Sequence, residues 1–287
     1  MRHSGAVKIA LGLVTHEGSR FNKEGTAEAQ IASIAQALTA AGHDVELLIS
    51  DRDDFDPARY SLGVANRIVT AWSQAALESR WSAHVGRLQP KSSSRSGLLE
   101  FTYHLGSGLR RSLSAAGIPG FGRDLNRISL ARLINIDLSH LRVWQAAHDW
   151  RADTALVLED DARLAEPDSQ TTLANLLTAL PTEGPVLSVL SRSISTTELK
   201  VRNVLDRSEP LDPHYPDLRL LPVPVTNTVC ANTYSQELIT GLLASITPES
   251  LTPVHPIDWR LNRYLLDNPK VTCVWSEPAP FVQMSMH

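Results

Sequence analysis

The first fifty residues show a strand–helix–strand pattern, which constrains the fold more than any other feature of the chain. Residues 7–14 form an apolar run interrupted only by Lys8, as expected of a parallel strand buried on both faces. Apolar residues then recur at helical spacing over 31–41, Gly42 ends the predicted helix, and 45–49 is a second strand. The pattern therefore predicts an α/β protein. In such proteins, ligands bind beyond the carboxyl ends of the strands.

The remainder of the chain continues the alternation of strands and helices. We expect strands at 155–158, 186–190 and 271–275, and helices at 235–243 and 257–266. Ser139 is predicted to be the N-cap of another helix, whose apolar face includes Trp144. Residues 206–217 are interpreted as a surface loop, and 218–229, interrupted by two prolines, as an irregular or edge strand.

A long helical segment separates the first strands from the later ones. Residues 66–116 are helical in character and are interrupted by a polar loop at 91–96. We therefore predict one mixed α/β domain, 1–287, with a helical insertion or subdomain at 62–125. The Gly- and Pro-containing connection Gly117–Asp124 is predicted to be a mobile loop that closes over a bound diphosphate.

The composition argues against several classes of protein. A chain of 287 residues that is 43% hydrophobic and 20% charged can bury a large core. A net charge of -4 without a dense Lys/Arg run argues against nucleic acid as a partner. The two cysteines, Cys230 and Cys273, form neither a disulfide framework nor a zinc motif. The apolar run at 7–14 is too short to cross a bilayer, so we expect a cytoplasmic protein with at most peripheral membrane contact.

The strongest chemical signal is the acidic run Glu159-Asp160-Asp161, directly after the strand at 155–158. Three adjacent carboxylates repel one another, and a divalent cation offsets that cost. Mg²⁺ or Mn²⁺ prefers oxygen ligands and diphosphate, and in sugar transfer such a metal neutralises the departing nucleoside diphosphate. In the alternative interpretation, Asp160 or Asp161 only caps a helical turn at 162–164.

The sequence around the acidic run resembles the family 25 glycosyltransferases, which include bacterial lipooligosaccharide galactosyltransferases and collagen galactosyltransferases. The similar stretches are 138–144, 155–162, 230–234, 256–259 and 277–283. They resemble the family's Ser-His pair opening a helix, its strand ending in Leu-Glu-Asp-Asp-Ala, its strand-to-helix step and its Pro-Val-Asp. The resemblance covers roughly 125–285, whereas the loop at 15–20 is only loosely similar. It implies a GT-A fold, with a Rossmann-like mixed sheet flanked by helices, a UDP-sugar donor and a divalent metal.

The resemblance and the residue pattern together assign a role to Asp258. This residue begins a predicted helix after Pro256, and it points away from the helix's apolar face. We predict that Asp258 is the general base for the acceptor hydroxyl in an inverting transfer. In the alternative interpretation, it is an ordinary first-turn Asp stabilised by the helix dipole. The predicted metal ligands are Glu159, Asp160 and Asp161, with His287 as a further candidate.

The residues expected to bind the donor follow the first two strands or lie in the similar stretches. They are Thr15, His16, Arg20, Asp51, Ser139, His140 and Asn232. Nucleotides bind at the carboxyl ends of strands in such sheets, which supports the first four. A capping or core role for His140 stays open, and Trp72 and Trp144 are predicted to be core residues rather than sugar platforms.

Two other functions remain as alternatives to a glycosyltransferase. A metal-dependent phosphotransferase or phosphohydrolase would use the same acidic strand end, but the chain has neither a GxxxxGK[ST] loop nor an Asp-x-Asp-x-Thr pattern. The other alternative is a catalytically inactive family member that binds a nucleotide or a partner. The acceptor of the predicted transfer is a glycan, a lipid-linked glycan or another hydroxyl compound.

Overall fold

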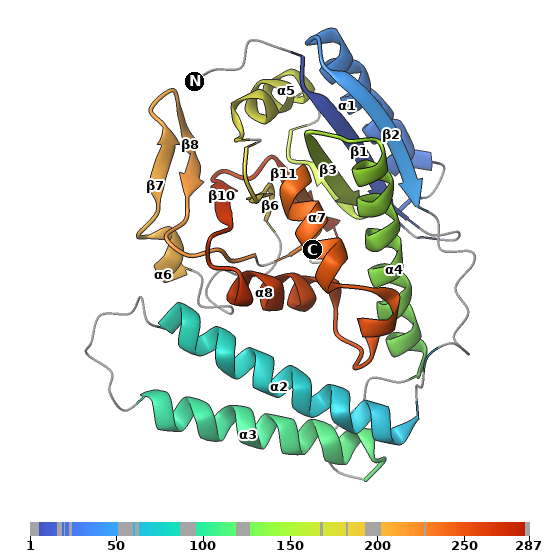
Figure 1. The fold of residues 1–287 in the computed structure, drawn as a ribbon, viewed down its shortest axis with the longest axis vertical. Coiled ribbons are helices and arrows are strands. Elements are labelled where there is room, and N and C mark those ends of the chain that lie inside the picture. The colour runs from blue at the N-terminus through green and yellow to red at the C-terminus, as the bar shows by residue number, and fades with distance from the viewer. Residues whose placement is uncertain are drawn as a thin grey trace.

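An eight-stranded mixed sheet lies at the centre of the computed structural model (Figure 1). Across the sheet its strands are β2 (Asp44–Ser50), β1 (Lys8–Val14), β3 (Thr154–Glu159), β9 (Ala231–Ser235), β5 (Val186–Val189), β10 (Thr272–Ser276), β8 (Tyr215–Leu220) and β7 (Glu209–Asp212). The structure describes residues 6–15, 19, 21–22, 25–50, 60, 63–86, 96–118, 127–166, 169–181, 183–192, 202–226 and 228–284.

The strand directions bring chain segments that are distant in sequence to one edge of the sheet. Strands β2, β1 and β3 are parallel, β9 runs antiparallel between β3 and β5, and β10 is parallel to β5. A second, three-stranded sheet has the order β4 (Ala162–Leu164), β11 (Phe281–Gln283) and β6 (Ser191–Arg192). Only two residues separate the end of β3 from the start of β4, so the small sheet starts where the acidic run lies.

Helices cover both faces of the large sheet, and each face has its own apolar cluster. Helices α1 (Thr26–Ala40) and α5 (Gln170–Ala179) pack on one face, and α4 (Arg127–Asp149), α7 (Gln236–Ser245) and α8 (Ile257–Asp267) pack on the other. The side chains of β1 alternate between the two faces: Leu11 and Leu13 pack with α1, whereas Ala10 and Val14 pack with α4. Because helices cover both faces of the sheet at β1, the strand is apolar from Ile9 to Val14.

The predicted helical insertion forms a hairpin of α2 (Val64–Gly86) and α3 (Ser96–Ala115) (Figure 1). Helix α2 packs against α8, where Trp81 and Trp259 make an edge contact with ring centroids 6.1 Å apart. Helix α3 lies outside α2, and Trp72 packs against its Gly108. Trp72 remains 39% exposed, so its prediction as a core residue is wrong, because the outer hairpin gives it little cover. Trp144 is fully buried, as predicted.

Most of the elements predicted from the sequence are confirmed. The strands and helices expected at both ends of the chain are present, with boundaries shifted by one or a few residues. Gly42 follows α1 with a φ of 92°, a left-handed conformation that side chains disfavour, and it ends that helix as predicted. Ser235 caps α7 by accepting a hydrogen bond from the backbone N–H of Leu238. The mixed α/β class is therefore confirmed.

Three local predictions are wrong. Ser139 is not an N-cap: it lies in the middle of α4, and its hydroxyl donates to the carbonyl of Asn135 one turn earlier. Residues 206–217 are not a loop, since most of them form β7 and the start of β8. For 218–229 the edge-strand alternative is wrong, because β7 pairs with β8 on its outer side, whereas the irregular alternative is confirmed for the described residues after Leu220. The two prolines of 218–229 lie after β8 ends.

The described part of the chain also contains two smaller elements, α6 (Arg202–Leu205) and the 3₁₀ helix η3 (Pro248–Leu251). Among the described residues, no helix combines the length and the apolar character that crossing a bilayer requires. Gly117 and Ile118 follow α3, but the rest of the predicted lid, 119–124, lies outside the described residues.

Candidate active site

The acidic run lies where β1 and β3 end side by side. Val14 is the register partner of Glu159, and the backbone N–H of Asp160 donates to the carbonyl of Val14 at 3.0 Å. After Asp161 the chain enters β4, which pairs with β11. The interpretation of the acidic residues as caps of a helical turn is therefore wrong, because residues 162–164 are a strand.

Glu159, Asp161 and Cys230 form a cluster whose side-chain ligand atoms all lie within 4.8 Å of one another. Asp161 and Cys230 are buried, and Glu159 is partly exposed. One oxygen of Asp161 accepts from the Cys230 thiol at 3.7 Å, and the other accepts from the Gln283 amide at 3.1 Å. Burial raises the pKa of Cys230 well above its ordinary value, and the charges of Asp161 and Glu159 raise it further.

Asp160 points to a different side of the strand end. Its carboxylate accepts a hydrogen bond from the hydroxyl of Thr15 at 3.1 Å, and both residues are buried. Thr15 follows β1 directly, so the two residues join the ends of the two adjacent parallel strands. The predicted set of three metal ligands therefore divides: Glu159 and Asp161 lie with Cys230, and Asp160 lies with the candidate donor residue Thr15.

His140 connects α4 to the cluster. Its Nε2 lies 3.3 Å from a carboxylate oxygen of Glu159, and the imidazole is completely buried. The ring also packs against Trp144, whose indole contacts Tyr234 of β9 with ring centroids 5.3 Å apart. Asn232 donates to the Tyr234 hydroxyl at 3.4 Å and is itself fully buried. His140 is thus both a core residue and a partner of Glu159.

Asp258 lies in the first turn of α8, where it accepts a hydrogen bond from the backbone N–H of Trp259 at 2.8 Å. Burial raises the pKa of this carboxyl to about 6, and the charge of Glu159 also raises it, while the Trp259 N–H opposes the shift. The two carboxylates are therefore near enough to influence each other. A carboxylate with this pKa is largely ionised at pH 7 and is a stronger base than an exposed Asp.

A buried ion pair holds the start of α8 against α4. Nε of Arg260 donates to Asp137 at 2.5 Å, and Asp137 is completely buried. The same guanidinium donates to the carbonyls of Ser250, Leu251 and Pro253, at 2.9–3.1 Å. Burial raises the pKa of Asp137 above its ordinary value, and the charge of Asp258 adds to the rise, while the ion pair with Arg260 opposes it. Arg260 thus fixes the segment that carries Asp258.

The structure brings together some of the predicted site residues and not others. Glu159, Asp161 and His140 gather at the carboxyl end of β3, with Thr15 and Asp160 beside them, and the charge of Glu159 also acts on Asp258. Ser139 bonds to its own helix, and Asn232 bonds to Tyr234 and to the Thr228 carbonyl. The candidates His16, Arg20, Asp51 and His287 lie outside the described residues.

Three residues of the site were missed in the sequence. Cys230 and Gln283 are predicted only as members of similar stretches, without a role in the site. Asp137 is not predicted as a site residue at all. The position of Cys230 at the start of the 230–234 stretch was a usable signal, because β9 pairs with β3 and so brings its first residues to the acidic strand end.

Comparison with models of known protein families finds no match for this chain, and comparison with curated proteins also finds none.

Proposed function

We propose that this protein is a metal-dependent glycosyltransferase of the GT-A type, which transfers a sugar from a UDP-sugar to an acceptor hydroxyl with inversion. One observation carries the proposal: Glu159 and Asp161 lie together at the carboxyl end of β3 in a mixed sheet, and the charge of Glu159 acts on Asp258. Ligands bind at this edge in sheets of this type. The resemblance of 125–285 to the family 25 glycosyltransferases points to the same chemistry.

The two carboxylates of the cluster fit a hard divalent cation, which prefers oxygen ligands. Their ligand atoms lie within 4.8 Å of each other, close to the span that a cation bonded at about 2.0–2.3 Å to each ligand allows. When bound there, Mn²⁺ or Mg²⁺ would neutralise the diphosphate leaving group. Asp161 is buried, and the Gln283 amide donates to one of its oxygens and so orients the carboxylate. Glu159 is oriented by His140.

Asp258 is assigned the role of general base. An inverting transfer needs one carboxylate that accepts the proton of the acceptor hydroxyl on the face opposite the leaving group. The raised pKa of Asp258, about 6, suits this role near neutral pH. Arg260 and Asp137 hold the first turn of α8 and so fix the position of this carboxylate. Thr15 and Asp160, which close the ends of β1 and β3, are proposed to contact the nucleotide.

Donor hydrolysis tests the proposal without knowledge of the acceptor. The purified protein is incubated with UDP-glucose, UDP-galactose or UDP-N-acetylglucosamine, with Mn²⁺ or with EDTA, and the products are separated by chromatography. A glycosyltransferase releases UDP from one donor, and only with the metal. Release of UMP or inorganic phosphate instead identifies a phosphohydrolase. Donor binding without any product identifies an inactive nucleotide-binding protein, and either result contradicts the proposal.

A further inference from the structure

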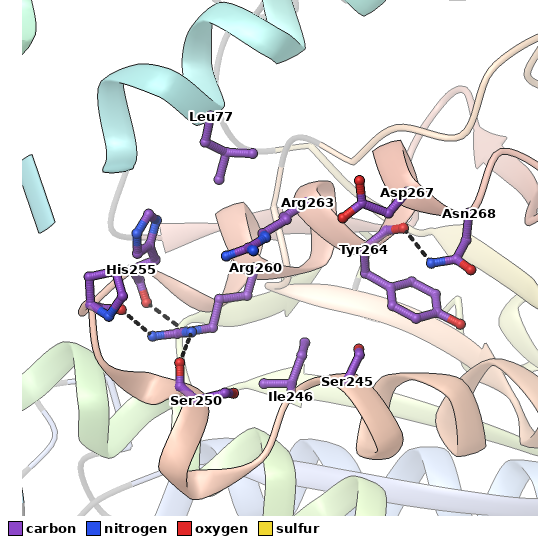
Figure 2. A pocket seen from close by; sticks show the side chains of 11 residues that line it. Leu77, Ser245, Ile246, Ser250, His255, Arg260, Arg263, Tyr264, Asp267 and Asn268 are labelled. Carbon is purple, nitrogen blue, oxygen red and sulfur yellow. Dashed lines mark hydrogen bonds between the residues drawn. The ribbon is translucent and has the colours of Figure 1, made fainter. Parts of the chain in front are cut away.

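A cavity of about 270 Å³ lies on the side of α8 that faces α2, and none of its lining residues belongs to the acidic cluster. Figure 2 shows Leu77 of α2 on one side and Ser245 and Ile246, at the end of α7, on the other, with Arg260 and Arg263 between them. The cavity thus lies where the helical hairpin meets the sheet domain.

The walls of this cavity are polar, unlike an ordinary packing gap between helices. Eight of its eleven lining residues carry polar side-chain atoms: Ser245, Ser250, His255, Arg260, Arg263, Tyr264, Asp267 and Asn268. Several of these groups already have partners. Arg260 is engaged with Asp137 and backbone carbonyls, and exposed Asp267 pairs with exposed Arg80 of α2 at 2.6 Å. Arg260 is therefore held in place.

The Arg263 side chain is exposed at the edge of the cavity, so its guanidinium is available to a ligand. Within the described part of the chain it takes part in no hydrogen bond or ion pair, although it lines the cavity. The one carboxylate in the lining, Asp267, is occupied by Arg80. The positive potential also affects His255, whose pKa is lowered to about 4 by burial first and then by the charges of Arg260 and Arg263. His255 is therefore neutral near pH 7 and presents no competing charge.

We propose that this cavity binds a small organic oxyanion, a carboxylate or a phosphate ester, whose charged group pairs with Arg263. The volume of about 270 Å³ accommodates a small anion. A guanidinium is the side chain best matched to carboxylate and phosphate oxygens. The site is separate from the proposed donor site and does not depend on the proposed function.

Binding of inorganic phosphate and of citrate tests the proposal. Thermal unfolding is followed in each anion and in sodium chloride of the same ionic strength, with EDTA present. Both anions are compared because the site must accept an oxyanion, whether phosphate or carboxylate. At least one of them should raise the midpoint of thermal unfolding above its value in sodium chloride, and the increase should level off as the anion concentration rises. Arg263→Gln should weaken that anion's affinity by about tenfold or more, since a charged hydrogen-bond partner is lost.

Two variants make the test specific. Arg207→Gln removes the same charge at an exposed position distant in sequence and should leave the anion effect unchanged. Ser245→Leu narrows the cavity from the opposite wall without changing any charge, and it should weaken binding as well. An equal anion effect in the natural protein and in Arg263→Gln would place the anion elsewhere and overturn the proposal. No effect of either anion beyond chloride would also overturn it.

Discussion

Replacing Gly12 by Ala should show how closely α4 is fitted to the sheet beneath the candidate active site. A Cβ at Gly12 would lie 2.3 Å from Cγ1 of Val143, which is a severe overlap with a buried side chain. Gly12 cannot move aside, because β1 is paired with β2 at Leu48 and with β3 at Val157. Overpacking of this kind costs about 1–3 kcal/mol, so the midpoint of thermal unfolding should fall by roughly 2–12 °C.

A double-mutant cycle isolates the contact responsible. Val143→Ala alone should destabilise the protein by about 1–3 kcal/mol, because it removes buried methyl groups. In the double variant the new methyl at position 12 occupies space that Val143 has vacated, so the two effects should not add. We expect an interaction free energy of about 1–2 kcal/mol in favour of the double variant.

The assay is reversible denaturant unfolding of the four proteins, with metal-dependent UDP binding measured in parallel. Val143 lies one turn after His140, which contacts Glu159 at 3.3 Å. If overpacking displaces α4, UDP binding should weaken in Gly12→Ala and recover in the double variant. Strict additivity of the two free-energy changes would refute the packing argument.

Three further predictions concern individual side chains. Asp258→Asn should lower the transfer rate by about 10²–10⁴-fold and leave UDP binding unchanged, and the natural protein's rate should rise with pH through about 6 because the ionised form is the base. Cys230→Ser should weaken binding of Zn²⁺ and Cd²⁺ more than binding of Mn²⁺, since softer ions prefer sulfur, as metal competition would show. Ser235→Ala should cost about 1–3 kcal/mol in denaturant unfolding, because its hydroxyl bonds to Leu238, Val186 and Gly184, whereas exposed Ser245→Ala should have little effect.

The fold was predictable from the sequence where one physical preference acted alone. The buried parallel strand β1 and the glycine at 42 each leave a clear local signal, and both are confirmed. Prediction failed where tertiary contacts decided the outcome. The polar, proline-containing stretch at 206–217 forms a hairpin because β8 pairs with β10, a partner more than fifty residues later in the chain.

The candidate site shows the same division. The acidic run can be recognised from the sequence, because the repulsion between adjacent carboxylates at a strand end must be offset by a bound group. The separation of Asp160 from Glu159 and Asp161 depends on how the chain leaves β3 and enters β4, and no local pattern contains that information. Cys230 and Gln283 reach Asp161 through strand pairings from distant segments, and Asp137 meets Arg260 only when α4 and α8 pack together.

Calorimetric titration of UDP tests the central claim most directly. The natural protein, Asp161→Asn and the control Asp149→Asn, which removes the same charge from an exposed residue, are each titrated with and without Mn²⁺. The natural protein and the control should bind UDP about tenfold or more tightly with Mn²⁺, and Asp161→Asn should lose that gain while remaining folded. UDP binding that is independent of Mn²⁺, or a full Mn²⁺ effect in Asp161→Asn, would contradict the assignment of this cluster as the metal and donor site.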